Sequence, residues 1–241
     1  MSHMVAKIVA LALAAGAIAS TPALADPPIG SRIDRSEKGL TGRYNPRNAD
    51  SPRPAINAFF RCTASLNRVR AKAALELPYS SDEQRAALEK VDSPGWSQDG
   101  EEDCFSMLGG GGVRFQYDPI SAIGGFAEYF VTREFKAEDA GQLASLSRED
   151  WQAAELVARN GSEAFGMCTA EAAGAQVYRL METEAASAEE KAAIQSIAPA
   201  LGPCLTKGQE VKFDAAALRA MLAHSLYRSL SGMKALKGAQ G

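Results

Sequence analysis

The runs "RCTAS" (61–65) and "MCTAE" (167–171) place the same Cys-Thr-Ala in helical sequence twice, 106 residues apart. The same shift brings "SDEQRAALEKV" (81–91) onto "SAEEKAAIQSI" (187–197) without a gap. The agreement therefore extends well beyond the cysteines.

A second block matches at a different constant shift. "FQYDPISAIGGFAEYFV" (115–131) falls on "VKFDAAALRAMLAHSLY" (211–227) at an offset of 96, after a loop that is longer in the first copy. Two constant offsets separated by a length change in a loop are typical of a duplication. Chance similarity between Ala-rich helices is the alternative, but the cysteines, cap residues and apolar spacing all agree.

The composition favours an all-α fold, because alanine is abundant and β-branched residues are scarce. Each copy is predicted to hold three helices, the first of them over 55–76 or 163–182. The two units would pack about a pseudo-two-fold axis, along a seam formed by the apolar and aromatic faces of 115–131 and 211–227. The alternating run 113–117 predicts one short strand and at most a small β-ribbon.

Polar residues mark where the later helices begin. Ser81 and Ser187 are predicted N-caps of the second helices, each followed three positions later by Gln84 or Glu190, in the pattern of a capping box.

The third helices are predicted to begin after Asp118, with Pro119 in the first helical position, and after Asp214. An additional helix is expected over about 148–159, capped by Ser147 and Asp150 and ended or bent by Asn160-Gly161.

Four cysteines follow the N-terminal region, Cys62, Cys104, Cys168 and Cys204. An even number in an exported chain indicates two disulfides, for which three pairings are possible. If the two units fold alike, Cys62 pairs with Cys104 and Cys168 with Cys204. Cys-Thr-Ala would then anchor a helix and would not be an active-site motif.

The N-terminus is typical of a secretory signal peptide. Lys7 precedes the apolar run 8–20, and "ALA" (23–25) supplies a small-x-small cleavage site before Asp26. We therefore expect cleavage after Ala25 and a periplasmic or secreted protein without a transmembrane span. Six segments are predicted: signal peptide 1–25, disordered arm 26–54, helical unit 55–136, linker with extra helix 137–161, helical unit 162–230 and flexible tail 231–241.

Charge and composition narrow the choice of partner. Without Lys7 the chain carries 25 Lys and Arg against 29 Asp and Glu, a formal charge of −4. This mild acidity gives no sign of nucleic-acid binding, which needs a basic face. The sequence leaves the partner unknown, with another envelope protein as one possibility, and neither a cofactor nor a metal is expected.

The pattern of helices and cysteines resembles a family of uncharacterised exported, Ala-rich helical bacterial proteins with duplicated two-cysteine units. "IGGFAEYF" (123–130) and "RAMLAHSLY" (219–227) each keep part of that family's last helix, Arg-Gly-Ala-Leu-Ala-Glu-Ala-Leu-Tyr. The first has Ile123 in place of arginine, and the second has His224 in place of glutamate. The resemblance implies export, helices and disulfides, and no activity.

Three polar residues of the third helices are the candidates for chemistry. His224, the one histidine beyond the signal peptide, occupies the position that Glu128 has in the first unit. A Glu–His pair meeting across the seam, with Arg219 beside it, would suit acid–base work or binding. The alternative is that these are polar positions at the edge of a helix face.

The sequence favours a non-enzymatic exported protein that acts through interaction or scaffolding. The alternative function is small-molecule binding or hydrolysis at the seam around Glu128, Arg219 and His224.

Overall fold

The computed structural model describes residues 32–35, 51–91, 104, 113–116, 118–206 and 214–239. Helices make up most of this part of the chain, which confirms the predicted all-α class. The elements in chain order are β1 (Arg32–Arg35), α1 (Arg53–Leu66), α2 (Arg68–Leu75), α3 (Asp82–Val91), β2 (Val113–Gln116), α4 (Pro119–Glu134), α5 (Ala137–Gly141), α6 (Arg148–Ala153), α7 (Gly161–Glu182), α8 (Ala188–Leu201) and α9 (Ala215–Ala239).

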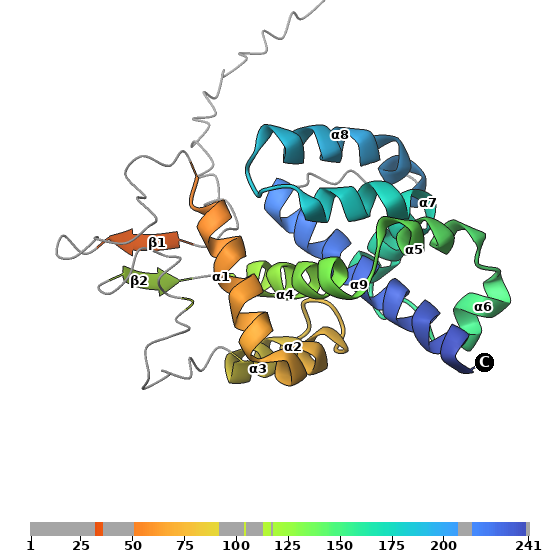
Figure 1. The fold of residues 1–241 in the computed structure, drawn as a ribbon, viewed down its shortest axis with the longest axis horizontal. Helices are drawn as coiled ribbons and strands as arrows, with labels where there is room; N and C mark the ends of the chain where they lie inside the picture. Colours follow the sequence, from red (N-terminus) through yellow and green to blue (C-terminus); the bar gives the residue numbers. More distant parts are fainter. Residues whose placement is uncertain are drawn as a thin grey trace, which may run out of the picture.

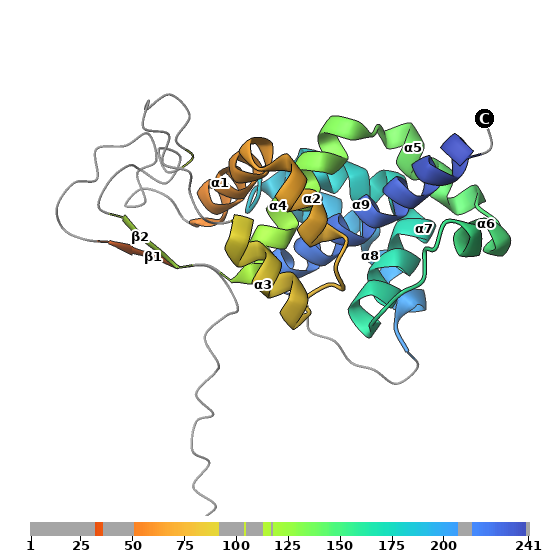
Figure 2. The same cartoon turned by 90° about the horizontal axis from the view of Figure 1, so that it is seen from below.

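Two helices from distant parts of the sequence, α4 and α9, pack against each other at the centre of the molecule. α1 packs on α4, and α7 packs on α9 and carries α8 on its other side (Figure 1). α9 runs along the length of the helical body and reaches α6 near its C-terminal end (Figure 2). We call α1–α4 the N-terminal half and α7–α9 the C-terminal half.

The core lies where α4 meets its neighbours. Phe60 of α1 contacts Phe126 of α4 with ring centroids 6.0 Å apart, and Phe130 of α4 contacts Tyr227 of α9 at 5.7 Å. All four side chains are at most 3% exposed. Tyr129, the other aromatic residue expected at the seam, is only partly buried.

The predicted caps are present, with one difference in detail. Ser81 and Ser187 accept hydrogen bonds from the amides of Gln84 and Glu190, at 3.1 and 3.0 Å. In a capping box the side chain of the N3 residue accepts a hydrogen bond from the backbone N–H of the cap residue. Here the N3 side chain accepts instead from the backbone N–H of the residue before the cap. Gln84 accepts from Ser80 N–H at 2.7 Å, and Glu190 from Ala186 N–H at 2.9 Å.

The reason is the backbone before each cap. Ser80 and Ala186 adopt left-handed conformations, with φ of 59° and 64°. This conformation turns their amides toward the first turn of the following helix. The two residues are separated by the same 106 positions as the cysteine runs.

The first helix of each half is interrupted. The predicted helix 55–76 is two helices, because Asn67 leaves the helical region (φ −117°, ψ 39°) and its side-chain amide donates to Thr63 C=O. Ala173 breaks the geometry inside α7 in the same way (φ −143°, ψ 33°). The two interruptions are again 106 positions apart.

The disulfides join Cys62 to Cys104 and Cys168 to Cys204, as the repeated pattern predicts. Their Cα–Cα distances are both 5.7 Å, and each bond closes within its own half.

The segment boundaries need two corrections. Residues 32–35, expected within the disordered arm 26–54, form β1, which pairs antiparallel with β2 in the register Arg32↔Gln116. The backbone of β2 offers hydrogen-bonding groups that β1 satisfies, so this stretch is ordered without a large apolar side-chain set. The same arm was expected to reach residue 54, whereas α1 begins at Arg53.

The expected tail 231–241 is helical through Ala239. It is held because Met233 is 2% exposed within the core and Lys234 lies over the ring of Phe135. The extra helix α6 has the predicted Ser147–Asp150 capping box but ends at Ala153, and Asn160 caps α7 where a bend was expected. The predicted signal peptide 1–25 lies outside the described residues.

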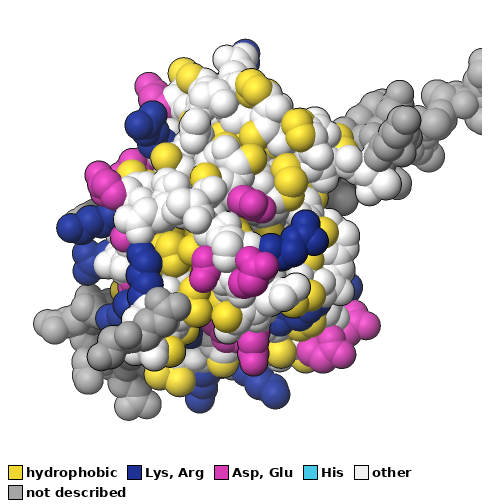
Figure 3. Space-filling model, turned by 90° about the vertical axis from the view of Figure 1, so that its right-hand side faces the viewer, with side chains coloured by type: hydrophobic (Ala, Val, Ile, Leu, Met, Phe, Trp, Pro, Cys, Tyr) yellow, Lys and Arg dark blue, Asp and Glu magenta, His cyan; other side chains and the backbone are white. Residues whose placement is uncertain are grey.

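The surface toward α6 and the C-terminal end of α9 carries side chains of both charge signs among hydrophobic ones (Figure 3). The large hydrophobic side chains exposed in the described ranges are Leu66, Val69 and Val157. None of the helices described has the length and apolar composition that crossing a membrane requires.

Candidate functional site

Glu128 and Arg219 form a bidentate ion pair between α4 and α9. Arg219 Nε donates to Glu128 Oε1 at 2.7 Å, and Nη2 donates to Oε2 at 2.9 Å. Glu128 is 1% exposed and Arg219 is 2% exposed. Both partners of the charge pair are thus withdrawn from water.

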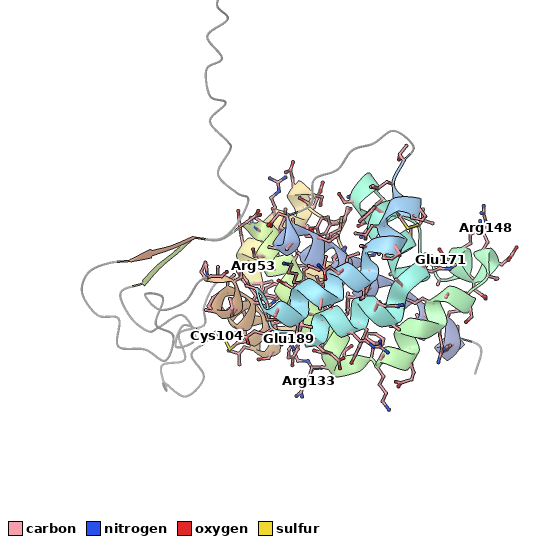
Figure 4. All side chains as sticks on the ribbon, turned by 90° about the horizontal axis from the view of Figure 1, so that it is seen from above. Arg53, Cys104, Arg133, Arg148, Glu171 and Glu189 are labelled. Carbon is pink, nitrogen blue, oxygen red and sulfur yellow. A yellow bond between two sulfur atoms is a disulfide. The ribbon has the colours of Figure 1, made fainter. Side chains whose placement is uncertain are left out.

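A second carboxylate, that of Glu190 at the start of α8, extends this pair. Arg219 Nη1 donates to Glu190 Oε1 at 3.1 Å, and Arg53 of α1 binds both Glu190 oxygens at 2.8 Å. Figure 4 shows Arg53 where α1 approaches the first turn of α8, marked by Glu189. Arg219 also donates to the hydroxyl and the carbonyl of Thr183, at 3.0 and 2.9 Å.

The charge of Arg219 is fixed by these partners. Burial alone would lower the pKa of its guanidinium, but the hydrogen bonds and charges of Glu128 and Glu190 outweigh it and raise the pKa. Arg219 is therefore a permanent cation that joins three helices, and it does not release a proton for acid–base chemistry.

Two residues of α1 complete the surroundings of Glu128. Asn57 Nδ2 donates to Glu128 Oε2 at 3.1 Å, and Arg61 Nη1 lies 3.6 Å from the same oxygen. We call Arg53, Glu128, Glu190 and Arg219, together with Arg61, the seam network.

His224 lies apart from this network and is fully buried. Its Nε2 is 3.0 Å from Leu75 C=O, so Nε2 carries the proton and donates to it. Nδ1 has no hydrogen-bond partner among the residues that the structure describes. Burial is the largest influence and lowers the pKa of His224 to about 4, against the opposing charge of Glu163. The imidazole is therefore neutral at pH 7.

The charged groups that act on His224 belong to a second cluster. Glu163 at the start of α7 accepts from Tyr79 N–H at 2.8 Å and from Arg159 N–H at 2.8 Å, and pairs with Arg228 of α9 at 3.0 Å. Although burial raises the pKa of this carboxyl, its bonds to Arg159 and to these amides lower it to about 2. Glu163 is thus charged and held by short bonds.

The three predicted candidates are therefore not assembled at one site. Glu128 and Arg219 do meet across the seam, but in the described part of the chain Glu128 and His224 share no hydrogen bond or ion pair. The expected Glu–His couple is replaced by a Glu–Arg couple, with His224 near Gln84 and Tyr79 in the other cluster.

An open cleft of about 610 Å³ lies beside the seam network, between α1 and the α7–α8 turn. Its lining residues are Pro54, Asn57, Ala58, Arg61, Cys62, Ser65, Tyr129, Glu182, Thr183, Glu184 and Ala185. None of the three predicted candidates is among them. Sequence reasoning missed this set because its members come from three separate elements and form no motif.

The described residues show no cluster of three or more His, Cys, Asp or Glu side chains that could hold a metal ion. Comparisons with family models, with curated proteins and with solved structures find no match for this chain. The resemblance to exported Ala-rich proteins accordingly remains an expectation.

Proposed function

We propose that this chain is an exported, non-enzymatic helical protein, periplasmic or secreted, that acts through interaction or scaffolding. One observation carries the proposal: Glu128 and Arg219, the side chains best suited to chemistry, are buried and bonded to each other. Both oxygens of Glu128 are bonded to Arg219, at 2.7 and 2.9 Å, inside the protein. The two disulfides support export, because such bonds persist in oxidising compartments.

We further propose that the two halves are duplicated units related by a pseudo-two-fold axis, with Ala-rich third helices at the seam. Gly124 and Ala220, equivalent at the offset of 96, lie against each other where α4 crosses α9. Thr63 donates to Phe59 C=O and Thr169 donates to Phe165 C=O, at 3.0 and 2.9 Å, at the offset of 106.

Export is tested by the intact mass of the untagged protein purified from its own cell envelope. We expect a chain that begins at Asp26 and is lighter by four hydrogens than the reduced form. A chain that keeps residues 1–25, or that has free thiols, would contradict the export proposal.

The interaction role is tested by cross-linking in intact cells, followed by mapping of the linked residues. We expect one envelope protein to be linked repeatedly through the same surface, with the link lost when that surface is substituted. Cross-links confined to the chain itself would contradict the role.

A second candidate function is small-molecule binding, and the cleft beside the seam network favours it. The residues first proposed for hydrolysis lie outside this cleft, so we propose binding alone. The cleft is open to solvent, and its lining combines the polar side chains of Asn57 and Arg61 with the apolar ones of Pro54 and Ala58, a combination found in ligand sites.

A further inference from the structure

We propose that the cleft binds a small organic monocarboxylate, whose carboxylate contacts Arg61 and Asn57 and whose apolar body packs against Tyr129 and Ala58. This inference rests on the second candidate function and names the ligand class of its site.

The position equivalent to Ala185 shows why the cleft is open. At the offset of 106, Ala185 corresponds to Tyr79. Tyr79, in the turn between α2 and α3, packs against the C-terminal half; the residue is 6% exposed, and its ring centroid lies 5.2 Å from that of His224. Asn160 Nδ2 donates to the backbone carbonyl of Tyr79 at 3.0 Å, and the backbone N–H of Tyr79 donates to the carboxylate of Glu163.

In the corresponding way, the α7–α8 turn faces α1 of the N-terminal half, but its residue at this position, Ala185, has only a methyl side chain. Ala185 lines the cleft instead of filling it. The protein thus has a phenol ring at one of two corresponding positions and a small methyl side chain, 5% exposed, in the lining of the cleft at the other. A ligand with a ring or short aliphatic body can take the place of the missing side chain.

The charge of the seam network favours an anion. Within the network alone, three arginines, Arg53, Arg61 and Arg219, face two carboxylates and leave one positive charge in excess; the cleft lining also carries the exposed carboxylates of Glu182 and Glu184. Arg219 is buried between both carboxylates and Arg53 is bidentate on Glu190. The excess charge therefore belongs to Arg61.

Of these three arginines, Arg61 makes the longest hydrogen bond to a protein group. Its Nη1 lies 3.6 Å from Glu128 and 3.5 Å from Met181 C=O, and only the 3.1 Å bond from Nη2 to Thr132 is short. The side chain is 33% exposed and lines the cleft. A guanidinium in this state gains most from a carboxylate that binds it in the fork geometry.

The rim and the walls restrict the ligand further. Glu182 and Glu184 are exposed residues of the lining and would repel a multiply charged anion such as phosphate more strongly than a singly charged one. The walls include Pro54, Ala58 and the half-buried Cys62, which favour an apolar body. A monocarboxylate with a ring meets both conditions.

The test uses isothermal titration of the oxidised full chain with 3-phenylpropionate, with its neutral amide and with inorganic phosphate. We expect one site for the carboxylate, binding at least tenfold weaker for the amide, and no binding of phosphate. Arg61→Gln should weaken carboxylate binding at least tenfold. Arg70→Gln, which removes an exposed arginine away from the cleft, is the matched control and should leave binding unchanged.

Two variants fill the cleft instead of changing its charge. Ala185→Tyr supplies the side chain found at the equivalent position, and Ala58→Phe fills the space from α1 in case the first variant is unstable. Either should abolish binding while the far-ultraviolet circular dichroism remains that of the parent chain. Binding that survives both substitutions in folded protein would place the ligand elsewhere and overturn the proposal.

The outcomes separate this inference from the function on which it rests. Equal affinity for the carboxylate and the amide, lost on filling the cleft, would overturn carboxylate recognition and leave small-molecule binding in place. Absence of binding for all three probes would overturn both.

Discussion

Gly124 of α4 and Ala220 of α9 touch at the crossing of the two central helices: a Cβ added to Gly124 would lie 2.7 Å from the Ala220 Cβ. Atoms at that separation cannot coexist, so the helices approach as closely as they do because one of the pair is glycine. The crossing also joins equivalent positions of the two proposed units.

Gly124→Ala should therefore destabilise the protein by about 1–3 kcal/mol, since overpacking forces one helix to shift. The exchanged pair Gly124→Ala with Ala220→Gly should recover most of the loss, because the crossing again holds one methyl group. Denaturant unfolding measures both. Gly238→Ala, where no atom lies within 4 Å of the added Cβ, is the control.

Arg219→Met should lower the free energy of unfolding by about 3–5 kcal/mol, because it leaves two buried carboxylates short of a partner. Arg85→Met removes an exposed arginine that forms an ion pair with the exposed Asp82, and should cost less than about 1 kcal/mol. Urea unfolding measures both losses. Equal losses would show that the seam network stabilises the protein no more than an exposed ion pair does.

Stability should fall on acidification because of His224. Its pKa is about 4 in the folded protein and 6.5 in the unfolded chain, so the unfolded state binds the proton first. The contribution of the neutral His224 to the free energy of unfolding is complete above pH 6.5, and it is lost as the pH falls from there through about 4. Between pH 7 and pH 5 the loss should be about 2 kcal/mol.

His224→Gln isolates this effect, because an amide does not titrate and can still donate to Leu75 C=O. Urea unfolding of this variant should show little change from pH 7 to pH 5. Glu163 does not interfere in that range, since its lowered pKa of about 2 makes its contribution fall only below pH 4.5. Parallel pH profiles for parent and variant would contradict the assignment.

Removing either disulfide by paired Cys→Ser substitution should cost about 2–5 kcal/mol. The two losses should be similar, because the bonds span 42 and 36 residues. Unfolding with and without a reductant gives the combined effect. A bond whose removal leaves the unfolding midpoint unchanged would not be contributing to the folded half that it closes.

The local signals in the sequence predicted the helices well. Ser81, Asp118 and Ser187 are short polar side chains directly before apolar periodic runs, and each caps the helix that was expected. The pairing of the cysteines followed from comparing the two halves, which requires no knowledge of tertiary contacts.

The failures all depend on contacts between distant residues. Nothing at Ala173 marks an interrupted helix, since alanine is the best helix former. The ordered end of α9 depends on packing around Met233 and Lys234. The partner of Glu128 was wrong because equivalence between positions 128 and 224 was taken to mean contact; opposite charge at Arg219, five residues earlier on the same helix, was the usable signal.

The placement of the disulfides has a consequence for how the chain could be divided. Neither bond crosses from the N-terminal half to the C-terminal half, so non-covalent contacts hold the folded halves together, among them the α4–α9 crossing, the seam network and the hydrogen bond from Tyr79 N–H to Glu163. A single cut in the backbone between α6 and α7 would yield two separately cross-linked fragments. They should reassociate as the subunits of a heterodimer do, which makes the protein a candidate for split-protein complementation.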